Sequence, residues 1–423
     1  MRKAALFVAA LLFITGLFAF RAVKTTQKTE RKHASFLMVS DVHVDTRAKK
    51  SNYGGDTGMD LWHAFLQKMD EILSGPDAPA FIVYTGDLPA HYKCNGTCYL
   101  TPAERAEHNA DIDTALAGLD RLASKHHKPL FYAPGNNDAL VGDYYSFADE
   151  KQQTSLSLLH ASPYFFPNKE NAQNQAGPRM IVNPEPGMGY YAAYPEKNLR
   201  LIVLNTVIFH QAFTTVDHTD PQADGEKEIK WLAQQLAEAA AAHEQVYLAM
   251  HIPPGIEIVH NSPMWAHSSK DGKDNWQADF LNLVSRYRTT IAAVLYGHTH
   301  MDEVRRLYDS TGRIVTAVAI SCPAVSPQHY NNPGFKVVEY DADTKQPVDF
   351  TTYYTTPDAV TWGNKSYTFD NAFGNTSGNT VYDYLSNMPI DSLERRVNSI
   401  FTVKHFMPMP FSTKKGIEVK MKQ

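Results

Sequence analysis

The sequence has little cysteine, no surplus of positive charge, and no internal repeat or long low-complexity segment. Its 423 residues include 3 cysteines, fewer than a structural zinc site with four cysteine ligands needs. The formal net charge of -5 leaves no basic surplus for gripping a nucleic-acid backbone, so we expect no nucleic-acid partner. A hydrophobic fraction of 43% and an aromatic fraction of 11% exclude a disordered chain. The 18 histidines are the unusual feature of the composition.

The N-terminus has the features of an export signal. Met1, Arg2 and Lys3 precede an apolar or small run over residues 4–20. We predict that residues 1–22 are a signal peptide, with an uncleaved signal anchor as the alternative, because no clear cleavage site follows. The protein is then exported: secreted, periplasmic or lumenal, or anchored to a membrane. In such a compartment Cys94 and Cys98 are expected to form a local disulfide, leaving Cys322 as a buried apolar residue.

Short apolar runs alternate with amphipathic stretches from residue 34 onward, which predicts an α/β (α+β) fold. In the part of the chain before residue 300, strands are expected over residues 36–39, 80–85, 129–133, 199–205, 245–250 and 291–296. Helices are expected over residues 60–73, 102–126, 225–243 and 276–287. Residues 313–320, 334–340 and 348–354 read as further strands with antiparallel neighbours. A polar stretch after about Pro357, then a helical pattern over 382–401, predicts a catalytic domain over 34–356 and a helical extension over 357–423.

Polar clusters follow five of the expected strands directly. In open αβ sheets, binding sites form just beyond the carboxyl ends of the strands, so these clusters are expected to converge. Alternate residues of an extended segment point to the same side, so each Asp-x-His or His-x-His pair can grip one metal. The candidate metal ligands are Asp41, His43, Asp87, Asn136, His251, His298 and His300.

These ligand types indicate two divalent cations. Oxygen and imidazole ligands suit zinc, with manganese or iron as alternatives. The set exceeds the needs of one ion and fits two ions about 3.5–4 Å apart, with Asp87 as the bridge. Because two carboxylates oppose two divalent ions, the site is formally positive and suits phosphate and hydroxide. Such a site lowers the pKa of bound water and presents hydroxide for in-line attack on phosphorus.

In this order, the clusters resemble the motifs of the calcineurin-like metallophosphoesterases. Three longer segments resemble the acid sphingomyelinase-like phosphodiesterase branch: Gly86-Asp87-Leu88-Pro89-Ala90-His91, His251-Ile252-Pro253-Pro254-Gly255 and Asn331-Asn332-Pro333-Gly334-Phe335. The resemblance implies a four-layer sandwich, in which two packed mixed sheets are flanked by helices. It also implies two zinc ions, one held by Asp41, His43 and His300 and the other by Asn136, His251 and His298, bridged by Asp87.

One residue departs from the family pattern, because Asn137 stands where the family usually has histidine. An amide can hydrogen-bond phosphate but cannot supply a proton. His91 resembles a second active-site histidine of the branch and is our candidate for the general acid, with Asn137 as a phosphate contact. We therefore expect nucleotides or other phosphoanhydrides to be hydrolysed faster than sphingomyelin.

Several alternatives stay open from the sequence alone. The chain could instead be a sphingomyelin or other lipid-headgroup phosphodiesterase, an endopolyphosphatase, or an inactive binding protein. Other candidate residues have a plain structural explanation as well: His210 and His260 as cleft residues, Tyr144 and Tyr145 as stacking residues, and Asp138 as a group that orients the site. Asn95, Asn364 and Asn375 fit the N-glycosylation pattern, which has meaning only for a eukaryotic source.

Overall fold

The first sheet joins parallel strands of the N-terminal half to antiparallel strands from near the C-terminus. In this computed structural model the described residues are 32–93, 98–159, 162–167, 178–216, 220–266, 268, 275–404 and 412–421, so the predicted signal lies outside them. The order is β18 (Ser366–Thr368), β17 (Pro347–Tyr354), β16 (Gly334–Asp341), β1 (His33–Val39), β4 (Ile82–Tyr84), β5 (Leu130–Tyr132) and β6 (Phe165–Phe166). Strands β1, β4, β5 and β6 are parallel, which aligns the carboxyl ends of β1, β4 and β5.

The second sheet has a parallel centre of β9 (Leu199–Val203), β10 (Gln245–Ala249), β13 (Ile291–Tyr296) and β15 (Val315–Ser321). Antiparallel strands flank it: β14 (Val304–Tyr308) on one side, followed by β19 (Glu418–Val419), and β8 (Tyr191–Glu196) with β7 (Arg179–Val182) on the other. Two short ribbons lie outside the sheets: β2 (Val44–Asp45) with β3 (Thr57–Gly58), and β11 (Ile256–Glu257) with β12 (Ser262–Pro263).

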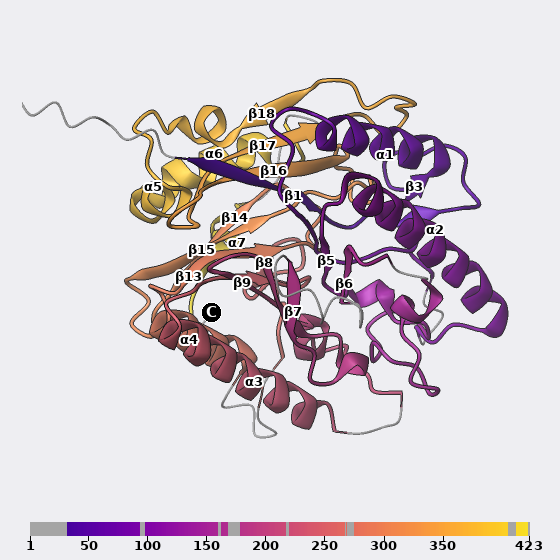
Figure 1. Ribbon diagram of the computed structural model, residues 1–423, viewed down its shortest axis with the longest axis horizontal. Coiled ribbons are helices and arrows are strands. Elements are labelled where there is room, and N and C mark those ends of the chain that lie inside the picture. The colour runs from indigo at the N-terminus through magenta and orange to yellow at the C-terminus, as the bar shows by residue number, and fades with distance from the viewer. Residues whose placement is uncertain are drawn as a thin grey trace, which may run out of the picture. The chain divides into compact units, whose positions relative to one another are not determined.

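The two sheets pack face to face and helices cover their outer faces, which confirms the predicted four-layer class. Phe36 of β1 and Tyr247 of β10 join the sheets, with ring centroids 5.5 Å apart. Helices α1 (Met59–Leu73) and α2 (Pro102–His126) lie on one side, and α3 (Pro221–Ala241) and α4 (Trp276–Arg286) on the other (Figure 1). The central strands are buried on both faces, which explains their continuous apolar runs.

Several expected elements differ in their bounds or place. Helix α3 begins four residues before the predicted start, because Asp220 caps it and Pro221 occupies its first turn. Strands β7, β8 and β14 were not predicted. The predicted strand 313–320 is β15, which has one antiparallel neighbour, β14, and a parallel one, β13, and lies in the other sheet from β16 and β17.

The residues after Pro357 contribute to both sheets. The expected helical pattern is two helices, α5 (Val381–Asn387) and α6 (Ile390–Ile400), interrupted at Pro389, and α7 (Lys414–Ile417) follows later. Strand β18 extends the first sheet, and β19 extends the second. The boundary near Pro357 stays a prediction, but the residues beyond it pack with the catalytic core rather than apart from it.

The cysteines, the surface charges and the helices bear on the predicted compartment. Cys98 is disulfide-bonded and Cys322 is free and buried, whereas Cys94 lies outside the described residues. Asn375 is buried and its amide donates to Asp370, so this glycosylation pattern is not on an open surface.

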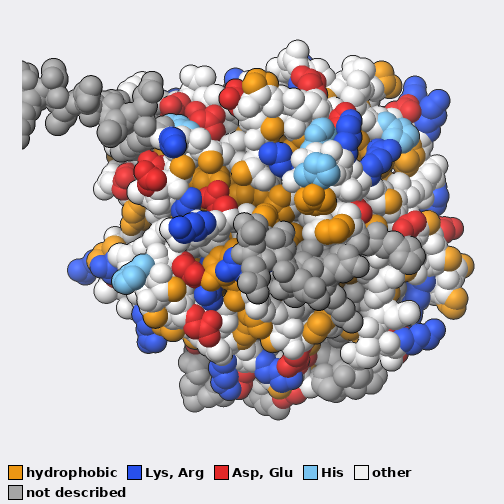
Figure 2. Space-filling view, viewed as in Figure 1, with side chains coloured by type: hydrophobic (Ala, Val, Ile, Leu, Met, Phe, Trp, Pro, Cys, Tyr) orange, Lys and Arg blue, Asp and Glu red, His pale blue; other side chains and the backbone are white. Residues whose placement is uncertain are grey.

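Lys, Arg, Asp and Glu side chains are interspersed over the face shown in Figure 2. None of the helices in the described part of the chain is long and apolar enough to span a membrane.

Glu228 of α3 generates a testable pH dependence of stability. The side chain is fully buried, its Oε1 accepts the Asn205 N–H at 2.8 Å, and burial raises its pKa to about 8. The folded state therefore holds a proton that the unfolded state releases above its ordinary pKa near 4.5. Stability from this group is complete below that value and is lost as the pH rises toward 8, by up to about 1.4 kcal/mol per pH unit. We expect Glu228→Gln, which keeps the acceptor oxygen, to reduce this loss in urea unfolding at pH 5 and pH 7.5; an unchanged pH dependence contradicts it.

Candidate metal centre

Loops from both sheets meet where the parallel strands end. The loops after β1, β4 and β5 come from the first sheet, and those after β10 and β13 from the second. Backbone hydrogen bonds join them: Asp41 N–H donates to the Gly86 carbonyl at 2.8 Å, and Gly297 N–H donates to the His251 carbonyl at 3.1 Å. The Asp41 carboxylate also accepts the His298 N–H at 3.1 Å, which ties the first sheet to the second. The structure thus brings together every one of the predicted ligands.

The local backbone of the ligands differs from the expectation. Alternation along an extended segment was wrong for both ligand pairs, because Asp41, His43, His298 and His300 all have positive φ, at 48°, 38°, 69° and 62°. Asp87 does too, at 65°. The left-handed conformation costs a residue other than glycine about 1–2 kcal/mol. Such conformations concentrate at functional sites, where the surrounding structure holds them in place.

Asp87 lies at the middle of the cluster. Its Oδ2 is 3.4 Å from Nε2 of His43 and 3.2 Å from Nε2 of His251. Asn137 holds the same carboxylate by donating its backbone N–H to Oδ1 at 2.8 Å and its side-chain amide to Oδ2 at 3.0 Å. One carboxylate oxygen therefore faces ligands from both sheets, which is the arrangement of a bridging ligand.

One group of ligand atoms surrounds Asp41 and His43. His43 donates from Nδ1 to the Pro89 carbonyl at 2.8 Å, so its Nε2 keeps a lone pair. Oδ1 of Asp41 lies 3.9 Å from that Nε2 and 3.5 Å from Nε2 of His300. Ser40 donates its hydroxyl to the other oxygen of Asp41. Asp41, His43 and His300 thus bring a carboxylate oxygen and two imidazole nitrogens close together.

A second group surrounds His251. Its Nδ1 donates to the Thr85 carbonyl at 2.6 Å, and its Nε2 faces Oδ1 of Asn136 at 3.0 Å. The Asn136 amide donates to Asp143 at 2.7 Å, which turns the amide oxygen toward the histidine. His298 completes this group, with its ring centroid 5.1 Å from that of His251. Asp87, His251 and His298 offer ligand atoms within 4.8 Å of one another.

The electrostatics of the two groups favour a bound positive charge. Nε2 of His43 is buried and has no hydrogen-bond partner among the described residues. Burial raises the pKa of Asp41 to about 7. Burial lowers the pKa of His251, but the charges of Asp87 and Asp41 outweigh it and raise that pKa to about 9. The cluster therefore holds positive charge as a proton when no metal is present, and divalent cations can replace that proton, so the residues fit two divalent ions.

His91 lies beside the cluster, where a third candidate group also includes His43 and His300. Its ring stacks on His43 with centroids 3.9 Å apart, and its Nδ1 contacts Asp56 at 2.8 Å. Burial lowers the pKa of His91, but the hydrogen bond to Asp56 outweighs burial and raises it. The carboxylate therefore fixes the ring, and Nε2 is the nitrogen left to face a ligand.

Asp138 joins the loops behind the candidate ligands. Its carboxylate accepts the backbone N–H groups of Asp87, Leu88 and Gly135 at 2.7–3.0 Å, and the Tyr132 hydroxyl at 2.8 Å. It thereby fixes the loops after β4 and β5, as expected of an orienting group.

A cavity of about 290 Å³ opens beside the candidate ligands. Its lining includes the polar residues Asp87, His91, Asn136 and His298, and also the apolar residues Ile258, Val259, Met264, Met301 and Phe401. Among its described lining residues Arg305 is the single Lys or Arg, and it is bound to Glu303 at 2.9 Å and to the Pro254 carbonyl at 2.9 Å. The lining of the cavity therefore combines charged and apolar side chains.

The minor candidates occupy different places. Tyr144 and His260 line the cavity, whereas His210 stacks on Tyr144 with centroids 4.3 Å apart. Tyr145 instead contacts Tyr99 edge to face. The sequence did not single out Asp56, Asp143 or His329, and the ring of His329 lies 4.4 Å from that of His300. Asp143 could have been found from the sequence, because the segment Gly142-Asp143-Tyr144 closely follows the third polar cluster. The sequence around Asp56 has no comparable pattern.

Comparisons with known proteins agree with this geometry. Residues 34–302 match the family model described as calcineurin-like phosphoesterase. The chain is 26% identical over 388 residues to a sphingomyelinase phosphodiesterase D of Dictyostelium discoideum, covering 90% of this chain and 77% of that protein. It is 30% identical to acid sphingomyelinase-like phosphodiesterase 3b of Homo sapiens, over 72% of this chain and 62% of that protein. It is 24% identical to a cyclic GMP-AMP phosphodiesterase of Homo sapiens, over 75% of this chain and 70% of that protein.

Several of these relatives are longer than the matched part. The chain spans less than two thirds of the human phosphodiesterase 3b and 40% of the human sphingomyelin phosphodiesterase. Among solved structures, a dimetal phosphatase from Danio rerio matches 79% of this chain and 98% of its own, at 13% identity and a TM-score of 0.47.

Gly135 provides a direct test of the cluster. A Cβ at this position lies 2.1 Å from Oδ1 and 2.4 Å from the backbone nitrogen of Asp87, so Gly135→Ala must displace the central carboxylate. We expect the affinity for zinc to fall by about tenfold or more, measured by equilibrium dialysis. Gly55→Ala is the control, since its nearest new contact is an ordinary 3.5 Å to the Asn52 carbonyl. Equal zinc affinity in the two variants contradicts the assignment.

Proposed function

The chain belongs to the calcineurin-like phosphoesterase family, and from that premise we propose that it is an exported, two-metal phosphodiesterase acting on small phosphorylated substrates. Its acid sphingomyelinase-like relatives place it among metal-dependent phosphoric ester hydrolases. The observation that supports the proposal most is the position of Asp87 Oδ2 between the histidines of the two ligand groups. The N-terminal segment 1–22 supports export as a signal peptide or anchor.

We assign the ligands by their contacts. Asp41, His43 and His300 would hold one ion, Asn136, His251 and His298 the other, and Asp87 both. Zinc is the proposed metal, with manganese or iron as alternatives. When bound, the two ions supply a nucleophilic water of lowered pKa and neutralise charge on the phosphoryl oxygens.

His91 is the proposed general acid. Asp56 holds its Nδ1, and its ring lines the cavity beside the candidate ligands, so Nε2 is directed toward a bound ester. Asn137 has a different task from the one its position suggested. Its amide donates to Asp87 and so maintains the bridging carboxylate, with at most its second amide hydrogen left for phosphate.

The charge of the cavity bears on the substrate class. A polyphosphate chain needs cations beyond the two metals, but Arg305 is already paired with Glu303. This favours a phosphodiester over ATP or polyphosphate, and it moves the proposal away from the phosphoanhydrides expected from Asn137 alone. Relatives named as cyclic GMP-AMP and sphingomyelin phosphodiesterases both cleave phosphodiesters by name. Nucleotide phosphodiesters are the first proposed class.

A lipid-headgroup phosphodiester is the second candidate. Val259 lines the cavity and is 62% exposed, and Tyr330, next to the cavity residue His329, is 52% exposed. Together with the apolar residues in the cavity lining, these exposed side chains are the features of the site that suit a substrate with a lipid part. A retained anchor at residues 1–22 would favour the same class.

A substrate panel tests both classes together. We expect hydrolysis of bis(4-nitrophenyl) phosphate and of a cyclic dinucleotide, with slower turnover of ATP and of sphingomyelin in mixed micelles. Asp87→Asn should remove both zinc and activity, since it weakens the shared ligand. If sphingomyelin is hydrolysed fastest, the result favours the lipid-headgroup class. If the protein binds two zinc ions but hydrolyses none of these esters, the proposal that it is a phosphodiesterase is wrong.

The proposed acid predicts a dependence on the leaving group. An ester with a poor leaving group needs protonation more than one that releases 4-nitrophenolate. His91→Asn should therefore lower kcat for an alkyl or phenyl phosphodiester by about 10²-fold or more, and lower it much less for bis(4-nitrophenyl) phosphate. His260→Asn, at an exposed position of the same cavity, is the control. Equal losses for both classes of ester in His91→Asn exclude it as the acid.

A further inference from the structure

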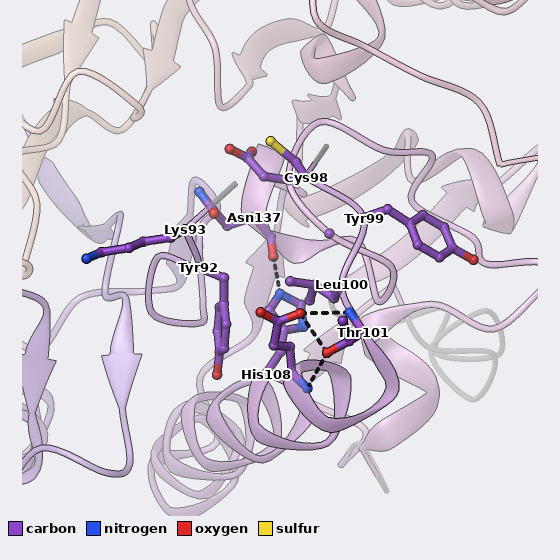
Figure 3. Close-up of a pocket in the computed structure, with 11 residues that line it drawn as sticks. Tyr92, Lys93, Cys98, Tyr99, Leu100, Thr101, His108 and Asn137 are labelled. Atoms are coloured by element: carbon purple, nitrogen blue, oxygen red, sulfur yellow. Dashed lines mark hydrogen bonds between the residues drawn. The ribbon is translucent and has the colours of Figure 1, made fainter. Parts of the chain in front are cut away.

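His108 is a buried histidine behind the metal centre that the proposed reaction does not use. It belongs to α2 and its side chain is 2% exposed. Its Nε2 lies 3.0 Å from the backbone carbonyl oxygen of Asn137, and both residues line a small cavity, where a dashed line joins them in Figure 3. The Tyr92 ring packs edge-on against it, with centroids 5.4 Å apart.

The partner of His108 fixes its protonation pattern. A carbonyl oxygen only accepts hydrogen bonds, so Nε2 carries the hydrogen and donates it. Burial lowers the pKa of His108 to about 4, so the ring is neutral near pH 7. A neutral ring adds no charge beside the cations, and its effect on the site is to fix one peptide group.

That peptide group belongs to the residue that holds the bridging carboxylate. Asn137 lies in a single 3₁₀ turn, Asn136–Asp138, and donates to both oxygens of Asp87, at 2.8 and 3.0 Å. The neighbours of Asn137 in this turn are held by Asp143 and by Asp138's own contacts. The Asn137 carbonyl is held by His108, which is thus linked to the metal bridge through one residue.

We propose that His108 is a positioning residue for the metal bridge: it holds the Asn137 carbonyl so that Asn137 keeps both of its hydrogen bonds to Asp87. This inference rests on the proposed two-metal function. Losing an outer partner of a metal ligand typically lowers metal affinity by about 10–100-fold. The effect should therefore reach the metals although His108 touches none of the proposed ligands.

The test compares two substitutions in the full chain loaded with zinc. His108→Leu removes the donor, whereas His108→Gln can place an amide N–H near the position of Nε2. We expect His108→Leu to lower zinc affinity by about tenfold or more and to lower kcat for bis(4-nitrophenyl) phosphate with little change in KM. His108→Gln should restore both values to within about threefold of the unsubstituted protein. Equal impairment in the two variants, or no loss in His108→Leu, overturns the inference.

Two controls separate this role from a loss of folding or of the proposed function. His126→Leu changes another histidine of α2, whose Nε2 contacts Asp70 at 2.6 Å, and should leave zinc affinity unchanged. In a cycle with Asn137→Ala, the loss of zinc affinity from His108→Leu should shrink, because both act on Asp87. Fully additive losses overturn the inference. If the unsubstituted protein binds no zinc, the proposed function fails; if it binds two ions, the outcome concerns His108 alone.

Discussion

The organisation of the site follows from one constraint: Oδ2 of Asp87 is a buried carboxylate oxygen that needs positive charge beside it. His43 and His251 approach this atom through Nε2, and neither ring is free to turn, because each donates from Nδ1 to a backbone carbonyl. Without a metal, a proton on His251 supplies positive charge beside the carboxylate, because burial lowers the pKa of His251 but Asp87 outweighs burial and raises that pKa to about 9. A divalent cation can take the place of that proton, so the buried groups suit a bound cation.

The backbone carries the cost of this arrangement. Asp41, His43, Asp87, His298 and His300 have left-handed conformations, at about 1–2 kcal/mol each. The strand ends of two packed sheets hold them there, through hydrogen bonds such as Asp41 N–H to Gly86 and Gly297 N–H to His251. Gly297 has no room for a Cβ, which would lie 2.0 Å from Ser40 Oγ. The rigid sheets therefore stabilise loop conformations that an isolated segment would not keep.

The sequence predicted the parts of the site that local pattern encodes. Apolar runs ending in Asp, Asn or His located the ligand loops, and the predicted helix over 102–126 matches α2, which Thr101 caps and Pro102 begins. Strand β14, with its buried arginines, has no apolar run to reveal it. Asp56 is 35 residues from His91 in the chain, so their contact arises only from the tertiary fold. The positive φ values were missed because alternation assumes an extended backbone.

Asn137 shows how a side chain's task depends on what lies behind it. Judged by residue type alone, Asn137 only removes the proton donor that a histidine would provide at this position. In the structure its amide and its N–H both hold Asp87, and His91, the proposed acid, lies on another loop. The proposed bridge and the proposed acid therefore belong to different loops, although the ring of His91 also stacks on the candidate ligand His43. His108 on α2 contacts Asn137, which holds the proposed bridge, and Asp56 contacts the proposed acid. The two proposed roles thus depend on different supporting contacts.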